Sequence, residues 1–90
     1  MQPGFGSATL GVRFNSENDG LKISLVAPGG PAAMSGLKIG DVVVGIDGRD
    51  VRDYPSVLSI LSNHKPEDLI TVKYRRGDDY RTVPLILGKR

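Results

Sequence analysis

Apolar and polar residues alternate along several short stretches of the chain, and a period of two is typical of half-buried β-strands. In LKISLVA, Leu21, Ile23 and Leu25 alternate with polar residues, and ITVKYRR repeats this pattern. The continuous apolar run in DVVVGI instead predicts a buried central strand. We therefore expect strands over residues 9–14, 21–27, 41–46, 70–76 and 80–87, with a very short one at 50–51.

The spacing of apolar residues becomes helical in the second half of the chain. Val57 and Leu61 are four residues apart, and Asp53 is a candidate N-cap, which predicts a helix over residues 54–63. A one-turn helix is predicted over residues 31–35, because a proline begins it and a glycine follows it. Five to six strands with one short and one longer helix predict a small α+β domain, a partly open antiparallel β-barrel or sandwich capped by the helices.

The composition narrows the classes of partner and location. With 39% hydrophobic and 24% charged residues, we expect one globular domain over residues 1–90, with residues 1–8 as an irregular lead-in. No apolar stretch approaches the roughly 20 residues that span a bilayer, so no membrane insertion is expected. The first residues show no signal peptide, which makes a cytoplasmic location the expectation. The net charge of +2 arises from interspersed charges, so nucleic acid is not an expected partner.

Residues suited to catalysis or to metal binding are scarce. The chain has no cysteine and one histidine, His64, in the polar segment SNHKPED. Nucleophilic catalysis needs a base within hydrogen-bond reach of the nucleophile, and the carboxylates that could bind a metal fall mostly in turns. We interpret His64 as a solvated residue at a helix C-terminus. The sequence therefore predicts neither an enzyme nor a site for a metal or another cofactor.

Gly11 is an unusual residue for the middle of the strand-like segment TLGVRF. Glycine inside a strand is less stable than alanine by roughly 0.5–1 kcal/mol. Either the backbone must bend in a way that a Cβ atom forbids, or a foreign backbone must approach closely. The first explanation is a requirement of the fold, whereas the second makes this segment part of a binding site.

The segment PGGPAAMSGLKIGDVVVGIDG, residues 28–48, resembles the central block of PDZ domains. In that family a Pro-Gly-x-Pro-Ala turn leads into a one-turn helix, a Gly-Leu-x-x-Gly-Asp stretch and a strand that ends at Asn-Gly or Asp-Gly. The short segment before TLGV and the additional last strand YRTVPLIL are similar to the circularly permuted PDZ domains of HtrA-type and tail-specific proteases. The resemblance implies a PDZ-like fold in which the last strand replaces the missing first one.

PDZ domains bind C-terminal peptides as an added antiparallel strand, so the resemblance implies a protein-interaction module that binds the C-terminal tails of partner proteins. The carboxylate-binding loop corresponds to Thr9, Leu10, Gly11 and Val12, with the last three donating backbone amides. The pocket for the last ligand side chain corresponds to Leu10, Val12, Phe14 and Leu61, all apolar, which predicts a hydrophobic C-terminal residue. The rest of the peptide groove corresponds to Arg13, Tyr54, Leu58 and Leu61.

Two details of this groove bear on its specificity. Tyr54 and Leu58 would favour an apolar ligand residue two positions before the C-terminus, but a shifted helix register would replace them with Ser56 and Ile60. The chain also lacks the basic residue that many PDZ domains carry before the loop, and Arg13 follows the loop instead.

Several functions remain open from the sequence. The first is an adaptor that binds C-terminal peptides, and the second is a regulatory or substrate-binding PDZ domain of a serine protease. The third is a PDZ fold whose groove serves self-association. Leu10, Val57 and Leu61 would also be core residues in any fold with this apolar pattern.

Overall fold

A six-stranded antiparallel sheet forms the body of the computed structural model, which describes residues 8–17 and 20–89. Its strands are β2 (Val12–Glu17), β3 (Gly20–Val26), β4 (Val42–Ile46), β5 (Arg49–Asp50), β6 (Leu69–Arg76) and β7 (Asp79–Ile86). The strand order is β2-β3-β4-β6-β7, and β5 pairs with β4. A separate two-stranded ladder joins β1 (Ala8–Thr9) to β8 (Gly88–Lys89).

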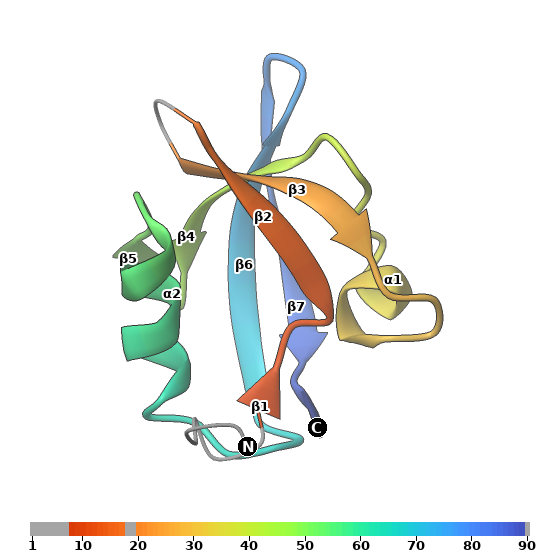
Figure 1. Cartoon of the computed structure of the whole chain (residues 1–90), viewed down its shortest axis with the longest axis vertical. Coiled ribbons are helices and arrows are strands. Elements are labelled where there is room, and N and C mark those ends of the chain that lie inside the picture. The colour runs from red at the N-terminus through yellow and green to blue at the C-terminus, as the bar shows by residue number, and fades with distance from the viewer. Residues whose placement is uncertain (1–7, 18–19, 90) are drawn as a thin grey trace.

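Two helices flank this open sheet. In the view of Figure 1, α1 (Pro31–Ser35) and α2 (Tyr54–Leu61) lie on opposite sides of β2. Gly36 ends α1 with a φ of 89°, which confirms the short helix expected from its flanking proline and glycine. The expected α+β class, with an open antiparallel sheet, one short helix and one longer helix, is confirmed.

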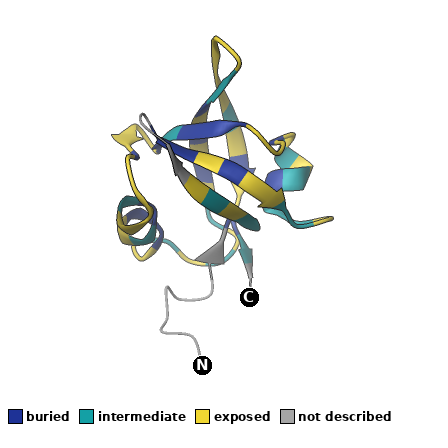
Figure 2. Ribbon diagram, turned by 45° about the horizontal axis from the view of Figure 1, so that its top comes forward, coloured by how far each residue is buried: buried dark blue, intermediate teal, exposed yellow. Residues whose placement is uncertain are grey.

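The alternation in the sequence corresponds to the two faces of the sheet. Figure 2 shows buried and exposed positions alternating along the strands. In β6, Ile70, Val72 and Tyr74 face the core, whereas Thr71 and Lys73 between them are exposed. The buried residues of α2 belong to the same core cluster, so α2 covers one face of the sheet.

Several predicted boundaries are wrong, most by one residue and some by more. The strand expected over residues 9–14 begins only at Val12 and continues to Glu17, because Gly11 has a φ of 75° and breaks the extended backbone. Ala8 belongs to β1 rather than to an irregular lead-in, whose other residues lie outside the described part of the chain. The longer helix ends at Leu61 rather than residue 63. Beyond it, Asn63 and His64 donate to carbonyls three residues back, as in a tighter turn.

His64 is not the solvated residue that we expected, because its side chain is 21% exposed and contacts two carboxylates. Its Nε2 lies 2.9 Å from Asp47 and its Nδ1 lies 3.1 Å from Asp68. Asp47 also accepts a hydrogen bond from the Thr71 amide at 3.0 Å. The backbone amide of Lys65, together with His64, holds the pKa of Asp68 below its ordinary value. These contacts fix the end of α2 to the β4–β5 turn and to β6.

An ion pair between a buried carboxylate and a partly exposed arginine connects the start of β4 to the end of β6. The Asp41 carboxylate is 2% exposed and accepts from Arg76 Nε and Nη2, both at 2.8 Å. It also accepts from the Lys38 amide at 2.9 Å. Burial by itself raises the pKa of Asp41, but the Arg76 guanidinium and the Lys38 amide together lower it to below its ordinary value.

Candidate functional site

β2 lies at one edge of the sheet, and β3 is its neighbour among the strands that the structure describes. Val12 and Val26 are register partners, and the Ala27 amide donates to the Gly11 carbonyl at 2.9 Å. In an antiparallel ladder this places Val12 at a non-hydrogen-bonded position relative to β3. The N–H and C=O groups of Val12 therefore point away from β3, toward the edge where another strand can pair.

The loop between β1 and β2 has its carbonyl groups directed toward α1 and the end of β3. The Leu10 carbonyl accepts from the Ala32 amide at 3.1 Å, and the Gly11 carbonyl accepts from Ala27. No described peptide bond is cis, so each following N–H points opposite to the carbonyl of its own peptide unit. The amides of Gly11 and Val12 thus both point away from α1 and β3. Successive amides directed to one side form a concavity suited to an anion.

Gly11 meets a requirement of the fold at this point. Its φ of 75° lies in the left-handed region, and a Cβ atom there would lie 3.0 Å from Cδ of Pro31 in α1. The bend turns the chain from the β1–β8 ladder into β2. It also sets the direction of the amide of Val12. The first explanation offered for Gly11, a bend that a Cβ forbids, is therefore confirmed.

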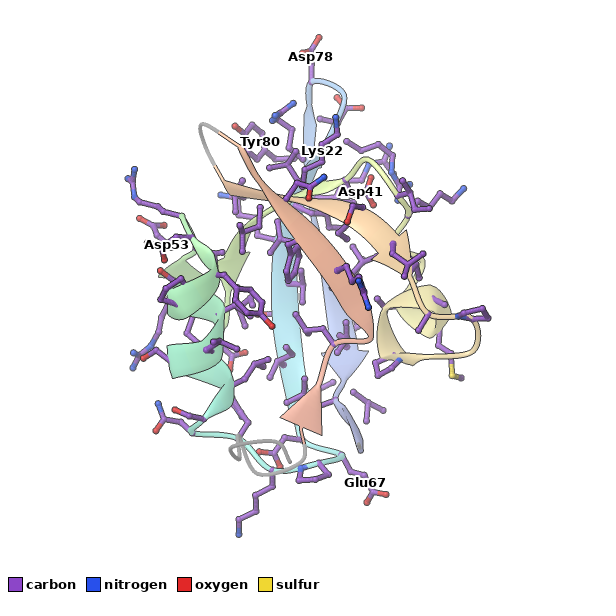
Figure 3. The ribbon with its side chains drawn as sticks, viewed as in Figure 1. Lys22, Asp41, Asp53, Glu67, Asp78 and Tyr80 are labelled. Atoms are coloured by element: carbon purple, nitrogen blue, oxygen red, sulfur yellow. The ribbon has the colours of Figure 1, made fainter. Side chains whose placement is uncertain are left out.

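The start of α2 faces β2 across a groove. The Asp53 side chain caps the helix by accepting from the Ser56 amide at 3.0 Å and from the Ser56 hydroxyl at 2.6 Å, and Figure 3 shows it at the start of α2. These two hydrogen bonds hold the pKa of Asp53 below its ordinary value. The Tyr54 ring then lies 6.3 Å from the Phe14 ring of β2, centroid to centroid. A groove of about 310 Å³ is lined by Val12, Arg13, Phe14 and Tyr54.

The helix contacts favour the expected register over the shifted one. Ile60 is 7% exposed and belongs to the core, and Ser56 hydrogen-bonds to the cap. Tyr54 is 53% exposed and faces β2. Leu58 follows Tyr54 by one turn and is half-buried, so it lies on the same helix face.

The structure places the other predicted residues in two groups. Leu10 and Leu61 are buried in the core cluster, as expected for these positions from the apolar pattern alone. Val12 and Phe14 are partly buried and pack against that cluster, and Arg13 is exposed on β2. Thr9 belongs to β1, where its backbone is the register partner of Gly88. The predicted pocket residues thus run from the core to the groove surface.

Sequence reasoning missed the residues that orient the loop. Ala27 and Ala32 donate backbone amide hydrogen bonds to the loop. The Pro31 ring occupies the space that a Cβ atom at position 11 would need. Almost any residue type can donate a backbone amide, so such contacts cannot be predicted from residue type. The signal that could have found them is the Pro-Gly-Gly-Pro-Ala turn itself, since this turn brings Ala27 and Ala32 to the same loop.

Neither membrane spans nor metal clusters are found among the described residues. None of the described helices is long and apolar enough to cross a bilayer. No group of three or more histidine, cysteine or carboxylate residues in the described chain could hold a metal ion.

Comparison with known proteins gives consistent matches. The family model for the PDZ domain matches residues 8–87. The serine protease Do-like HtrA of Lactobacillus helveticus is 40% identical over 68 residues, which cover 76% of this chain and 16% of that protein. The structure of the HtrA-type protease AlgW with a decapeptide has a TM-score of 0.86 at 24% identity, over 93% of this chain and 30% of that one. The HtrA3 PDZ domain bound to the phage-derived ligand FGRWV has a TM-score of 0.78 at 20% identity, over 89% and 84% of the two chains.

The PDZ match extends from β1 to the end of β7 and includes both helices. The chain spans only 16% of the Lactobacillus helveticus protease, and the matched part is the non-catalytic PDZ module of such proteases. The resemblance to the PDZ domains of HtrA-type proteases, first inferred from residues 28–48 and the last strand, is confirmed. The chain belongs to the PDZ domain family, a class of peptide-binding interaction modules.

Proposed function

We propose that this chain binds C-terminal peptides as an added antiparallel strand between β2 and α2. The observation that carries the proposal is the orientation of Val12, whose N–H and C=O groups point to the open edge of β2. An incoming strand needs this edge for its backbone. It also needs a site for its terminal carboxylate, which the amides of residues 10–12 provide at the start of β2.

The lining of the groove supports a preference for apolar ligand residues. Val12 and Phe14 line the groove, and Leu10 and Leu61 lie in the core cluster against which they pack. Together these four residues receive the last ligand side chain, for which we propose Val, Leu, Ile or Phe. Tyr54 and Leu58 contact the residue two positions earlier, so the recognised motif is apolar-x-apolar at the C-terminus. The ligand FGRWV of the HtrA3 PDZ domain ends in valine, which is compatible with the first part of this motif.

The expected affinity is moderate. Burial of one apolar side chain contributes roughly 1.5–3 kcal/mol, and hydrogen bonds to a charged carboxylate contribute roughly 1.5–3 kcal/mol each. Association entropy offsets part of this gain, which leaves roughly −7 to −8 kcal/mol, a micromolar dissociation constant.

A second function is favoured by the relatives. Because the chain is 40% identical to part of an HtrA serine protease, the same groove would present substrate tails to a protease domain or regulate that domain. In that role the PDZ domain selects the tail, and a separate protease domain performs the cleavage. Both functions use one peptide-binding event, so they differ in the remainder of the polypeptide and not in the groove.

The proposal is tested by a C-terminal peptide library followed by NMR titration of the labelled chain with the best binder. We expect selected peptides to end in apolar residues, and the largest amide shifts to fall on residues 11–14 and on α2 from Tyr54 to Leu61. Shifts confined to another surface would contradict the proposal. So would a chain that selects no peptide and forms dimers through the β2 edge, which would indicate self-association.

A further inference from the structure

A second hollow, of about 500 Å³, lies away from the peptide groove. Its walls come from the end of β4, from β5 and the two residues after it, and from the outward-facing residues of β6 and β7. The polar lining residues are Arg49, Asp50, Arg52, Thr71, Lys73, Tyr80 and Thr82. The buried residues of β6 and α2 share one core on the other face of the sheet. None of the four residues that line the peptide groove lines this hollow. It is therefore a separate surface of the domain.

The hollow contains three cationic side chains, Arg49, Arg52 and Lys73, and one carboxylate, Asp50. Removing these three from the twelve basic residues and this one from the ten acidic residues leaves equal numbers, so the net charge of +2 is concentrated here. The sequence does not show this, because Lys73 is more than twenty positions from the two arginines and reaches them only through the pairing of β4 with β5 and β6.

The three cations have no anionic partner within the described part of the chain. Elsewhere Arg76 pairs with Asp41, and Arg81 lies 3.8 Å from Asp79. In the hollow, by contrast, the Lys73 ammonium lies 5.5 Å from the centroid of the Tyr80 ring, in a cation–π contact. Figure 3 places Tyr80 below the tip of the β6–β7 hairpin that carries Asp78. This contact holds the ammonium at the wall while its positive charge stays uncompensated by a carboxylate.

We propose that this hollow binds a small organic molecule that carries at least two phosphate groups, as a soluble phosphate ester or as a lipid headgroup. Guanidinium groups present pairs of N–H donors that match phosphate oxygens, and lysine adds a compact positive charge. Lys73 and Thr82 are register partners on neighbouring strands, so a hydroxyl donor lies beside the ammonium. The Tyr80 ring offers an apolar surface to the organic part. The volume falls within the roughly 300–1,000 Å³ of small-molecule sites.

The test is an NMR titration of the whole chain with inositol 1,4,5-trisphosphate at physiological ionic strength, with citrate as a tricarboxylate probe. We expect saturable shifts at residues that line the hollow and weaker binding of citrate. The variants Arg49→Gln and Lys73→Gln should each weaken binding by about tenfold, the loss of one charge-assisted contact. Arg81→Gln is the matched control, because it removes the same charge from β7 at a position that does not line the hollow.

Binding to phosphatidylcholine vesicles, with and without phosphatidylinositol 4,5-bisphosphate, distinguishes a lipid headgroup from a soluble ester. Binding only to the phosphorylated vesicles, displaced by soluble trisphosphate, supports a lipid headgroup. Binding of the soluble trisphosphate without vesicle binding supports a soluble ester. The proposal is overturned if millimolar trisphosphate gives no shifts in the hollow, if citrate binds equally well, or if Arg81→Gln weakens binding as much as Lys73→Gln does.

Discussion

The Phe14 ring of β2 and the Tyr54 ring of α2 lie with their centroids 6.3 Å apart and their planes at 59° to each other. This tilted contact joins the two walls of the peptide groove near the start of the helix. In the proposed binding mode, the peptide carboxylate would lie at the Gly11 loop, and the preceding residues would run beside this pair. In this mode the pair would contact the ligand residues that precede the C-terminus.

Replacing Tyr54 should change peptide selectivity more than stability. Tyr54 is 53% exposed, so Tyr54→Ala should leave the unfolding free energy within about 0.5 kcal/mol of the parent. Loss of the aromatic wall should weaken binding of an apolar-x-apolar peptide by roughly tenfold. The measurement is calorimetric titration with two peptides that differ only at the residue two before the C-terminus. Tyr54→His should shift the preference at that residue toward Ser or Thr, and an unchanged ratio of affinities would contradict the assigned role.

Gly11→Ala should destabilise the domain and reduce binding together. A Cβ at φ 75° costs roughly 1–2 kcal/mol, and its 3.0 Å approach to Pro31 adds to that cost. Gly29→Ala is the matched control, because Gly29 has a similar φ of 71° with nothing within 4 Å of the added Cβ. We expect Gly29→Ala to lower stability by the backbone cost alone and to leave peptide affinity unchanged. Chemical denaturation and peptide titration of both variants separate the two effects.

Acid should weaken the fold through Asp41. Its pKa is below the ordinary value of 3.8 in the folded state, so its contribution to stability is present above pH 3.8 and is lost as the pH falls through the folded pKa. Asp53 and Asp68, whose pKa values are also lowered, act in the same direction. The unfolding free energy measured against pH should therefore decrease on the acidic side of 3.8.

Asp41→Asn should lower stability at neutral pH, since it weakens the charge-assisted hydrogen bonds that the buried carboxylate accepts from Arg76 and from the Lys38 amide. It should also flatten the acid limb of the stability curve. Asp78→Asn, at the exposed β6–β7 turn, is the control and should leave the curve in place. An Asp41→Asn variant with the parent's acid limb would show that other groups carry the pH dependence.

The cap of α2 should depend on the Asp53 oxygen rather than on its charge alone. Asp53→Ala removes the acceptor for the Ser56 amide and should lower the melting temperature, whereas Asp53→Asn keeps a capping oxygen and should lie closer to the parent. Because the cap also positions Tyr54, Asp53→Ala should weaken peptide binding beyond any effect of Asp53→Asn. Equal melting temperatures for the two variants would contradict the capping role.

The sequence pattern predicted the helices and strands that are determined by residues within or next to them. The proline and glycine that bound α1 and the Asp53 cap of α2 act within a few residues, so their positions in the sequence are enough. Strand β6 follows from strict alternation along one buried face. The β1–β8 ladder was missed because it is only two residues long and joins distant parts of the chain.

The candidate site was predictable only in part. Resemblance identified Gly11, Val12 and Tyr54, but periodicity alone would have assigned Leu10 and Leu61 to the core, where they indeed lie. The choice between two helix registers needed the contact of Tyr54 with Phe14, which depends on tertiary packing. The cluster of three cations on the other face needed the pairing of three strands, so the interspersed charges of the sequence concealed it.

The most direct test of peptide capture compares two synthetic peptides of one sequence, ending in an apolar-x-apolar motif, with a free carboxylate on one and an amide on the other. Both are titrated calorimetrically into the unmodified domain. We predict micromolar binding of the free acid and at least roughly tenfold weaker binding of the amide, because the backbone amides of residues 10–12 lose a charged acceptor. Equal affinity of the two peptides would contradict recognition of a chain end by this loop.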